Sequence, residues 1–240
     1  MNTPLEDITI GEIVARDFRA AAIFQRFGID FCCGGKRSVP AACRTAAVEP
    51  SLVLASLDEL RPEEGASDNP TGWSVDRLAT HIVDTHHAYI RSSGPTISAY
   101  LEKLVKVHGA RHPELARIFH AFGQMYRELL PHMMKEEHVL FPYLGELTSA
   151  VAGAKFVSPF GTVLNPIHMM EREHEEVGSE MRVIRELTSD FTPPEDGCTT
   201  YRVCFAELQR FEQDLHRHVH LENNVLFPRA VALEERVCRG

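Results

Sequence analysis

The sequence has no long apolar run. No segment approaches the roughly 20 consecutive apolar residues that a membrane-spanning helix needs. The first residues, from Met1 to Asp7, are acidic and lack the basic-then-apolar pattern of a secretory signal. We therefore expect a protein that does not enter a membrane and that works in the cytoplasm.

The sequence also has no excess of basic residues. Its 25 Lys and Arg residues are outnumbered by 34 Asp and Glu residues, and the formal net charge is −9. Because a protein that binds the phosphate backbone of nucleic acid needs a basic face, we expect no nucleic-acid partner. The six cysteines show no regular spacing, which argues against a disulfide scaffold and favours reduced thiols. We interpret four of them as structural: Cys43, Cys198, Cys204 and Cys238.

No stretch alternates convincingly between apolar and polar residues, so the sequence predicts no β-sheet. The predicted fold class is all-α. A small helical N-terminal domain is expected over residues 1–62, and an up-down-up-down four-helix bundle over residues 73–240. The stretch 61–72 is rich in Pro, Gly and acidic residues, and it is the predicted linker.

Helix signals set the expected boundaries within these domains. In the N-terminal domain we expect one helix over 10–27, stopped by Gly28, and two short helices near 40–45 and 51–60. In the bundle, helices are expected over about 74–108, 113–147, 165–188 and 199–235. Two details concern proline: the run 92–95 should break or bend the first bundle helix, and Pro113 should occupy the first position of the second. A Pro- and Gly-containing connection is expected over 151–161.

One motif occurs twice. His132 and Glu136 are followed by Val-Leu-Phe-Pro, and so are His218 and Glu222, at the same internal spacing. Residues four apart lie on one face of a helix, so each copy aims an imidazole and a carboxylate in the same direction. A lone pair of this kind is usually a surface or buried hydrogen-bonded pair. Two matching copies favour a metal that accepts nitrogen and oxygen ligands.

Both pairs interrupt apolar stripes that should face the core, and His174 interrupts a third. A buried carboxylate is costly unless it is paired or bound to a cation, so these residues need a common partner. By symmetry the first bundle helix should supply a histidine too. The parallel six-residue spacing of His81 with His87 and of His168 with His174 favours His87, although periodicity alone does not decide between His86 and His87. Three histidines lie off the stripes and should be solvated or lie around the site: His138, His216 and His220. Val139 should lie on a stripe that faces the core.

The resulting ligand set has four imidazoles and two carboxylates: His87, His132, Glu136, His174, His218 and Glu222. Zinc usually binds four ligands, and in structural sites it prefers thiolates. Six nitrogen and oxygen ligands fit a pair of iron or manganese ions better, with the two glutamates bridging them, and imidazole with carboxylate suits iron. Such a site leaves room for oxygen, nitric oxide or an oxo bridge.

These residues resemble a known family. The bundle resembles hemerythrin-like domains, and nearly the whole chain resembles the iron-sulfur cluster repair di-iron proteins, bacterial proteins induced by nitrosative and oxidative stress. The resemblance rests on the segments Asp30–Lys36, His132–Glu137, Met170–Glu176 and Leu221–Ala230. It implies two iron ions in an oxo- and carboxylate-bridged centre, with Glu136 and Glu222 as bridges and His87 as a ligand. It also implies functional roles for Cys32, Cys33 and Glu173.

The chain departs from the family pattern at two positions. Pro131 directly precedes a predicted ligand, where a proline removes a backbone hydrogen bond and is expected to kink the helix. Ile90 stands where some members have a further histidine. The ligand set is unchanged by either departure.

The Cys-Cys-Gly-Gly segment admits two interpretations: a Gly-rich turn with two small buried thiols, or a functional unit for iron handling, thiol redox chemistry or docking. Adjacent side chains diverge, so we expect Cys32 and Cys33 not to clamp one metal well. The neighbouring Lys36 and Arg37 should favour a thiolate.

The expected function is that of a stress-response protein that binds nitric oxide and supports repair of damaged iron-sulfur clusters by donating iron. The alternatives are a nitric oxide reductase that forms nitrous oxide and a non-catalytic nitric oxide buffer or sensor. The expected partners are nitric oxide or oxygen and damaged iron-sulfur proteins as clients, and a homodimer is one candidate assembly.

Overall fold

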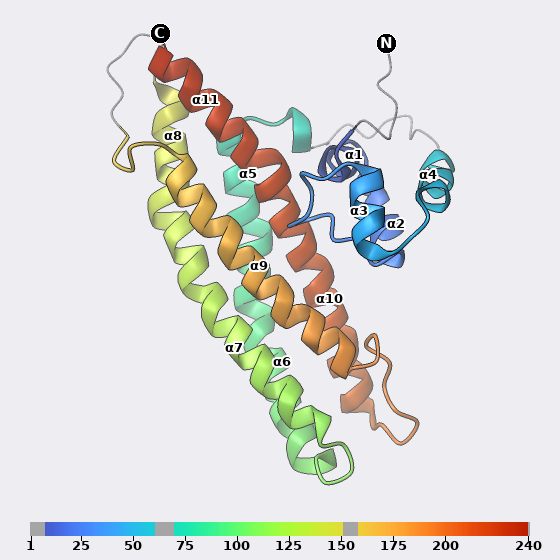
Figure 1. Ribbon diagram of the computed structural model, residues 1–240. Helices are drawn as coiled ribbons and strands as arrows, with labels where there is room; N and C mark the ends of the chain where they lie inside the picture. The colour runs from blue at the N-terminus through green and yellow to red at the C-terminus, as the bar shows by residue number, and fades with distance from the viewer. Residues whose placement is uncertain (1–7, 61–69, 151–157, 240) are drawn as a thin grey trace. The chain divides into compact units, whose positions relative to one another are not determined.

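The computed structural model describes residues 8–60, 70–150 and 158–239, and the regular structure in them is helical (Figure 1). The only β-pairing among these residues is an isolated bridge between Thr9 and Ser38. The all-α prediction is therefore confirmed. None of the described helices is both long enough and apolar enough to span a bilayer. Most of the predicted linker and of the 151–161 connection lies outside the described residues.

By its internal contacts the chain divides into two compact units. The first comprises residues 1–79, 145–164 and 217–240, and the second comprises residues 80–144 and 165–216. The predicted domain boundary at 62–73 was drawn from linker composition, and it stays a prediction.

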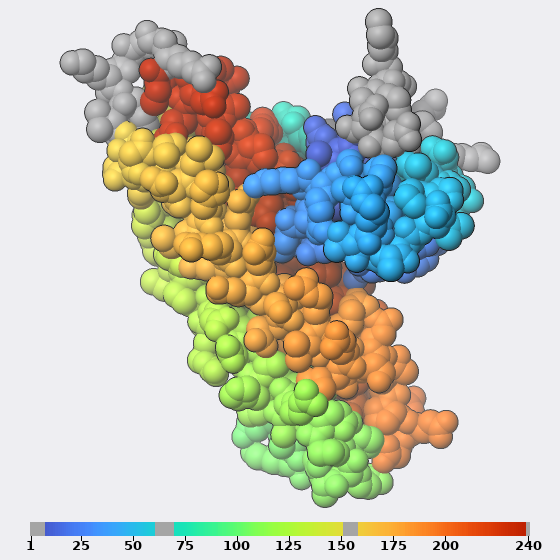
Figure 2. Space-filling view, in the orientation of Figure 1, coloured from blue at the N-terminus to red at the C-terminus, as the bar shows by residue number. Residues whose placement is uncertain are grey.

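The N-terminal part of the first unit is a closely packed cluster of four short helices (Figures 1 and 2). They are α1 (Ile10–Arg16), α2 (Ala20–Arg26), α3 (Val39–Ala46) and α4 (Pro50–Asp58). The same unit also contains η2 (Pro70–Gly72), most of α5 (Val75–His81) and of α8 (Phe141–Ser149), η5 (Glu222–Leu226) and α11 (Phe227–Arg239).

The single helix predicted over 10–27 is wrong, because the chain breaks at Asp17. Asp17 has an extended backbone, with φ at −146°. Its carboxylate accepts a hydrogen bond from the backbone N–H of Arg19 at 3.0 Å and pairs with the Arg19 guanidinium. Such a local side-chain bond competes with the helical pattern and stops the first helix. Gly28 ends the second helix as expected, with φ at +65°.

The second unit is a bundle of long helices. These are α6 (Ala88–His108), α7 (Glu114–Lys135) and most of α9 (Leu164–Leu187) and of α10 (Thr199–Leu221), which passes into the first unit at Arg217. The segments η3 (Ile82–His87) and η4 (Glu136–Leu140) belong to the second unit as well. Ser74 caps α5 through its hydroxyl, which accepts from the N–H of Arg77 at 3.2 Å. Pro113 is the residue before α7 and not its first helical residue, which is a one-residue correction.

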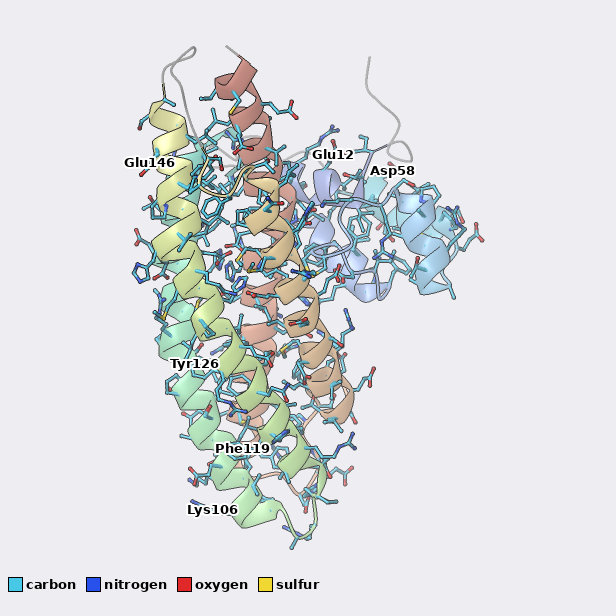
Figure 3. All side chains as sticks on the ribbon, turned by 60° about the vertical axis from the view of Figure 1, so that its left-hand side comes forward. Glu12, Asp58, Lys106, Phe119, Tyr126 and Glu146 are labelled. Atoms are coloured by element: carbon cyan, nitrogen blue, oxygen red, sulfur yellow. The ribbon has the colours of Figure 1, made fainter. Side chains whose placement is uncertain are left out.

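The expected break at 92–95 does not occur, because α6 runs through Pro95. The pyrrolidine ring is on the exposed side, and the Ser93 hydroxyl donates to the Tyr89 carbonyl at 2.7 Å. Gly94 serves packing instead: a Cβ atom there would overlap the ring of Tyr126 on α7, which Figure 3 labels. The prolines therefore mark no element boundary here. Pro131 likewise lies within α7 without ending it.

Among the described residues, three short π-helical segments interrupt the long helices, and three of the six predicted ligands lie in them. Glu136 opens η4, Glu222 opens η5, and His87 closes η3. Each π-turn adds a residue to the helical repeat and therefore shifts the face that follows. The consequence in η4 is that Leu140 is buried whereas Val139 is 47% exposed, so the prediction for Val139 is wrong.

Candidate metal centre

Four of the six predicted metal ligands converge within the second unit. His87, His132, Glu136 and His174 are each at most 2% exposed. The Nε2 atoms of His132 and His174 lie 3.0 Å apart. The Nε2 atoms of His87 and His132 each lie 3.4 Å from a different oxygen of Glu136. Three imidazoles thus direct their Nε2 atoms toward one another or toward the same carboxylate.

The other two predicted ligands, His218 and Glu222, belong to the first unit and are fully buried. His218 Nε2 lies 3.0 Å from Glu222 Oε1. Two groups of four residues have ligand atoms that all lie within 4.8 Å of one another, and Glu136 and Glu222 belong to both. The first group adds His87 and His218, and the second adds His132 and His174.

The far nitrogens of two of these imidazoles contact carboxylates. His87 Nδ1 lies 2.7 Å from Glu137 Oε1, and His132 Nδ1 lies 2.8 Å from Glu173 Oε2. Glu137 accepts hydrogen bonds from Arg91, and Glu173 pairs with Lys135. A carboxylate on Nδ1 fixes the imidazole so that Nε2 presents its lone pair, which is the usual arrangement behind a metal-bound histidine.

The hydrogen bond from His132 holds the pKa of Glu173 well below its ordinary value, at about 2, despite partial burial, and Lys135 contributes in the same direction. Burial acts to raise the pKa of Glu137, but its hydrogen bonds with Arg91 and His87 prevail and lower it. The carboxylates of Glu137 and Glu173 are therefore both ionised at neutral pH. The sequence drew attention to Glu173 but not to Glu137, because an outer partner shares neither the spacing nor the stripe of the ligands.

The structure distinguishes His87 from His86. The Nδ1 atom of His86 lies 2.8 Å from Asp214 Oδ1, and His86 belongs to neither group of four. Among the off-stripe histidines, His138 is exposed, as expected. Of the two alternatives expected for His220, a solvated side chain is excluded, because it is 1% exposed and packs against the rings of Phe18 and Phe31.

This donor set fits the cations that the sequence suggested. All six groups offer nitrogen or oxygen, and none offers sulfur, which suits iron better than a structural zinc ion. Two imidazole nitrogens at 3.0 Å need a proton or a cation between them, since two lone pairs repel.

We predict that Glu173→Gln lowers iron affinity by about 10- to 100-fold, the usual effect of losing an outer carboxylate. The amide keeps the size of the side chain but weakens the hold on His132. Competitive chelator titration measures the change. Glu175→Gln is the matched control, since Glu175 lies on the same helix and is exposed. Equal affinities of the two variants would contradict an orienting role for Glu173.

The second candidate element is the Cys-Cys-Gly-Gly loop of the first unit. The Oδ1 atom of Asp30 accepts the backbone N–H groups of Cys32, Cys33 and Gly34 at 3.1, 3.0 and 3.4 Å. Cys32 is buried and Cys33 is half-buried, and their sulfur atoms lie 4.0 Å apart. The loop is therefore built around one carboxylate and two thiols.

The structure corrects the expectation of a thiolate at Cys32. Its neighbour Cys33, its burial and the charge of Asp30 all raise the pKa of Cys32 well above the ordinary value. Lys36 is exposed, and the Arg37 guanidinium donates to the Gly34 carbonyl. The thiol is thus protonated at neutral pH in the absence of a cation. All six cysteines lie in the described residues, and none forms a disulfide.

Two asparagines of η5, directly after Glu222, anchor this loop. Asn224 donates to the carbonyls of Phe31 and Cys32 at 3.3 and 3.1 Å, and Asn223 lies 3.4 Å from the Cys32 carbonyl. Cβ atoms on Gly11 or Gly35 would overlap the Asn224 side chain. Glycine at positions 11 and 35 therefore leaves the space that the Asn224 side chain fills.

We predict that Asn224→Ala lowers the free energy of unfolding by about 1–3 kcal/mol, because the Phe31 carbonyl loses the Asn224 amide and the Cys32 carbonyl loses the nearer of its two asparagine donors. Denaturant unfolding measures this. Gln213→Ala, an exposed change on α10, should have little effect. Cys32 should also react faster with iodoacetamide in Asn224→Ala. An unchanged unfolding midpoint and an unchanged alkylation rate together would show that Asn224 does not hold the loop.

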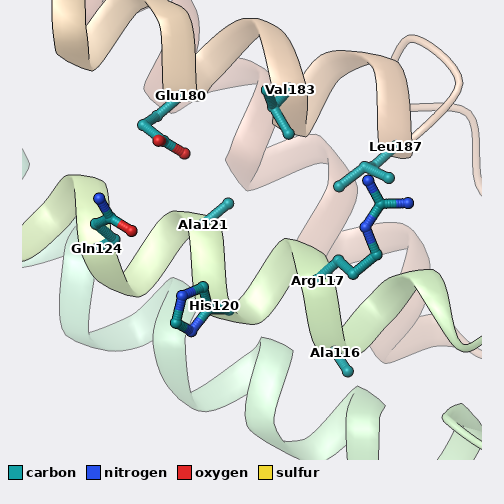
Figure 4. A pocket seen from close by; sticks show the side chains of 8 residues that line it. All are labelled: Ala116, Arg117, His120, Ala121, Gln124, Glu180, Val183 and Leu187. Atoms are coloured by element: carbon teal, nitrogen blue, oxygen red, sulfur yellow. The ribbon is translucent and has the colours of Figure 1, made fainter.

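Apart from these sites, a surface groove of about 490 Å³ lies along α7 and α9 (Figure 4). Its lining residues are Ala116, Arg117, His120, Ala121, Gln124, Glu180, Val183 and Leu187. No predicted site residue takes part in it, and we assign it no chemistry.

Comparison with known proteins identifies both parts of the chain. The hemerythrin HHE cation binding domain matches residues 78–230, and the ScdA_N domain, described as a domain of unknown function, matches residues 6–61. The Iron-sulfur cluster repair protein YtfE of Dickeya chrysanthemi is 33% identical over 225 residues, covering 94% of this chain and 97% of the relative. The proteins of the same name from Musicola paradisiaca and Pectobacterium carotovorum are 33% and 32% identical, over 93% and 94% of this chain and 96% and 97% of their own. The predicted family is thereby confirmed: the chain belongs to the hemerythrin HHE cation-binding family and, within it, to the iron-sulfur cluster repair proteins.

Proposed function

We propose that this protein binds two iron ions through His87, His132, Glu136, His174, His218 and Glu222. The observation that carries the proposal is the pair of four-residue groups that have Glu136 and Glu222 in common. One carboxylate has two oxygens and can serve two cations at once. Each cation would have two imidazoles of its own and the two carboxylates in common.

A pair of iron ions, when bound, supplies reversible binding of small ligands and one-electron chemistry. The chain supplies the surroundings. Glu137 and Glu173 orient the imidazoles, and the ring of Phe141 stacks on His87 with the ring centroids 6.0 Å apart. Because every ligand is at most 2% exposed, only a small molecule such as nitric oxide or oxygen fits the role of an added ligand.

We further propose that the protein acts in the response to nitrosative and oxidative stress and supports the repair of damaged iron-sulfur clusters, with iron donation as its contribution. Two lines support this: the name of the relatives that match almost the whole chain, and a loop with two thiols in the same chain. The clients would be damaged iron-sulfur proteins. The unpaired cysteines fit a reducing compartment, and we place the protein in the cytoplasm. We also propose a homodimer as the assembly of this protein.

Reduction of nitric oxide to nitrous oxide is the second candidate. The same overlap of the two groups favours it, because adjacent cations allow two nitric oxide molecules to be held side by side. A nitric oxide buffer or sensor would need binding alone. Measurement of nitrous oxide under anaerobic conditions with a reductant separates these candidates, since only the reductase yields the gas.

The central experiment is metal analysis of protein from iron-replete cells, with visible spectra before and after addition of nitric oxide. We expect about two iron ions per chain and a spectral change with nitric oxide. Two zinc ions and no iron would refute the proposal. A repair assay on a damaged iron-sulfur protein then tests the thiols: the double variant Cys32→Ala/Cys33→Ala should still bind nitric oxide but repair poorly. Full repair by that variant would remove the thiols from the proposed function.

A further inference from the structure

The Cys-Cys-Gly-Gly loop has the geometry of a second metal site, distinct from the six ligands of the bundle. Ligand atoms of Asp30, Cys32 and Cys33 all lie within 4.8 Å of one another. The expectation that adjacent cysteines diverge holds for extended backbone, but residues 32–34 form bends. Their side chains are therefore not forced to opposite faces.

The separations between the ligand atoms of the loop fit one cation of the size of zinc. Metal–sulfur bonds of about 2.3 Å, combined with sulfur atoms 4.0 Å apart, give a sulfur–metal–sulfur angle of about 120°. The Asp30 carboxylate is close to the two sulfurs, with Oδ1 3.3 Å from the Cys32 sulfur, so it is within reach of a cation that they hold. The sulfur–metal–sulfur angle is ordinary for a four-coordinate metal, so the two cysteines would not need to move.

Hydrogen bonds also fix the conformation of the loop without a cation. Asp30 accepts three backbone N–H groups of the loop, and Asn224 fastens the Cys32 carbonyl from η5. A carboxylate has several acceptor positions on two oxygens, so Asp30 can cap the loop and still offer oxygen to a cation. Such support usually accompanies ligands that hold a metal.

We propose that Asp30, Cys32 and Cys33 bind one thiophilic divalent cation and leave a fourth coordination position open. Binding turns two thiols into thiolates and releases two protons to solvent, with no change of oxidation state. Structural metal sites are closed by four protein ligands, whereas three ligands and a half-buried Cys33 suit exchange with an incoming thiolate or water.

This inference gives the loop a role in metal handling, and in that respect it deepens the proposed function, but its test does not depend on iron in the bundle. The test uses the full-length, reduced, iron-loaded protein, titrated anaerobically with Cd²⁺. Thiolate-to-cadmium charge transfer appears in the ultraviolet only if sulfur is bound, and the bundle ligands contain no sulfur. We expect the band to saturate at one Cd²⁺ per chain, with release of two protons and slower alkylation of Cys33.

Three variants decide the outcome. Cys33→Ser should lose the band, and Asp30→Asn, which can still cap the loop, should weaken binding by about tenfold or more. Cys198→Ser/Cys238→Ser removes the two exposed thiols and should keep the band. A band that survives in Cys33→Ser, or that is lost with the exposed thiols, would overturn the proposal, as would the absence of any band. Iron content, measured on each sample, reports separately on the bundle site.

Discussion

Glu136→Ala is expected to leave the protein with less than about a tenth of its iron. Glu136 is fully buried and belongs to both groups of ligand atoms, so its loss would remove a ligand from each cation of the proposed centre at once. Loss of a residue that only hydrogen-bonds a metal ligand lowers metal affinity by about 10- to 100-fold. Loss of a ligand shared by two cations should lower it further. Iron per chain, measured by metal analysis after gel filtration, checks the prediction.

The matched control for this change is Glu176→Ala. Glu176 is an exposed glutamate on α9 that is not among the predicted ligands, and its replacement should leave the iron content unchanged. Glu222→Ala should behave like Glu136→Ala, because Glu222 also belongs to both groups. If Glu136→Ala retained half of the iron or more, the two cations would not have this carboxylate in common, and the proposed centre would be wrong.

Removal of the metal is expected to lower the melting temperature by roughly 5–16 °C. A ligand at 100 to 1,000 times its dissociation constant stabilises the folded state by about 2.7–4.1 kcal/mol. For a chain of this size, 1 kcal/mol shifts the melting temperature by about 2–4 °C. Without cations, Glu136 and Glu222 would be left as carboxylates in a buried position, at a cost to stability.

Differential scanning calorimetry on iron-loaded and chelated protein measures this shift. Added iron should restore the transition in the wild type and should not raise it in Glu136→Ala, because that variant no longer binds the ion. A chelated protein that melts at the same temperature as the loaded protein would show that the six buried ligands do not need a cation for stability.

Much of this protein could be predicted from its sequence alone. The lack of alternating stretches predicted the all-α class, and repetition of the His-x3-Glu motif within apolar stripes predicted the burial of His132, Glu136, His218 and Glu222. These features are local: they depend on the 3.6-residue repeat of a helix and on the cost of burying charge, which any sequence with this pattern must satisfy. The break at Asp17 was missed because a single side-chain hydrogen bond to the backbone outweighed an apolar pattern that continued past it.

The tertiary structure alone decided what depends on neighbours from distant parts of the chain. Helical periodicity alone left His86 and His87 open; the structure adds the physical reason for His87, because the π-turn of η3 shifts the helical face and Asp214 lies opposite His86. The orientation of His87 and His132 depends on Glu137 and Glu173, whose partners stand on other helices. The pairing of Cys32 with Cys33 and Asp30 depends on a bent loop that Asn224 holds from the other end of the sequence. Periodicity describes one helix at a time, whereas these contacts exist only once the helices have packed.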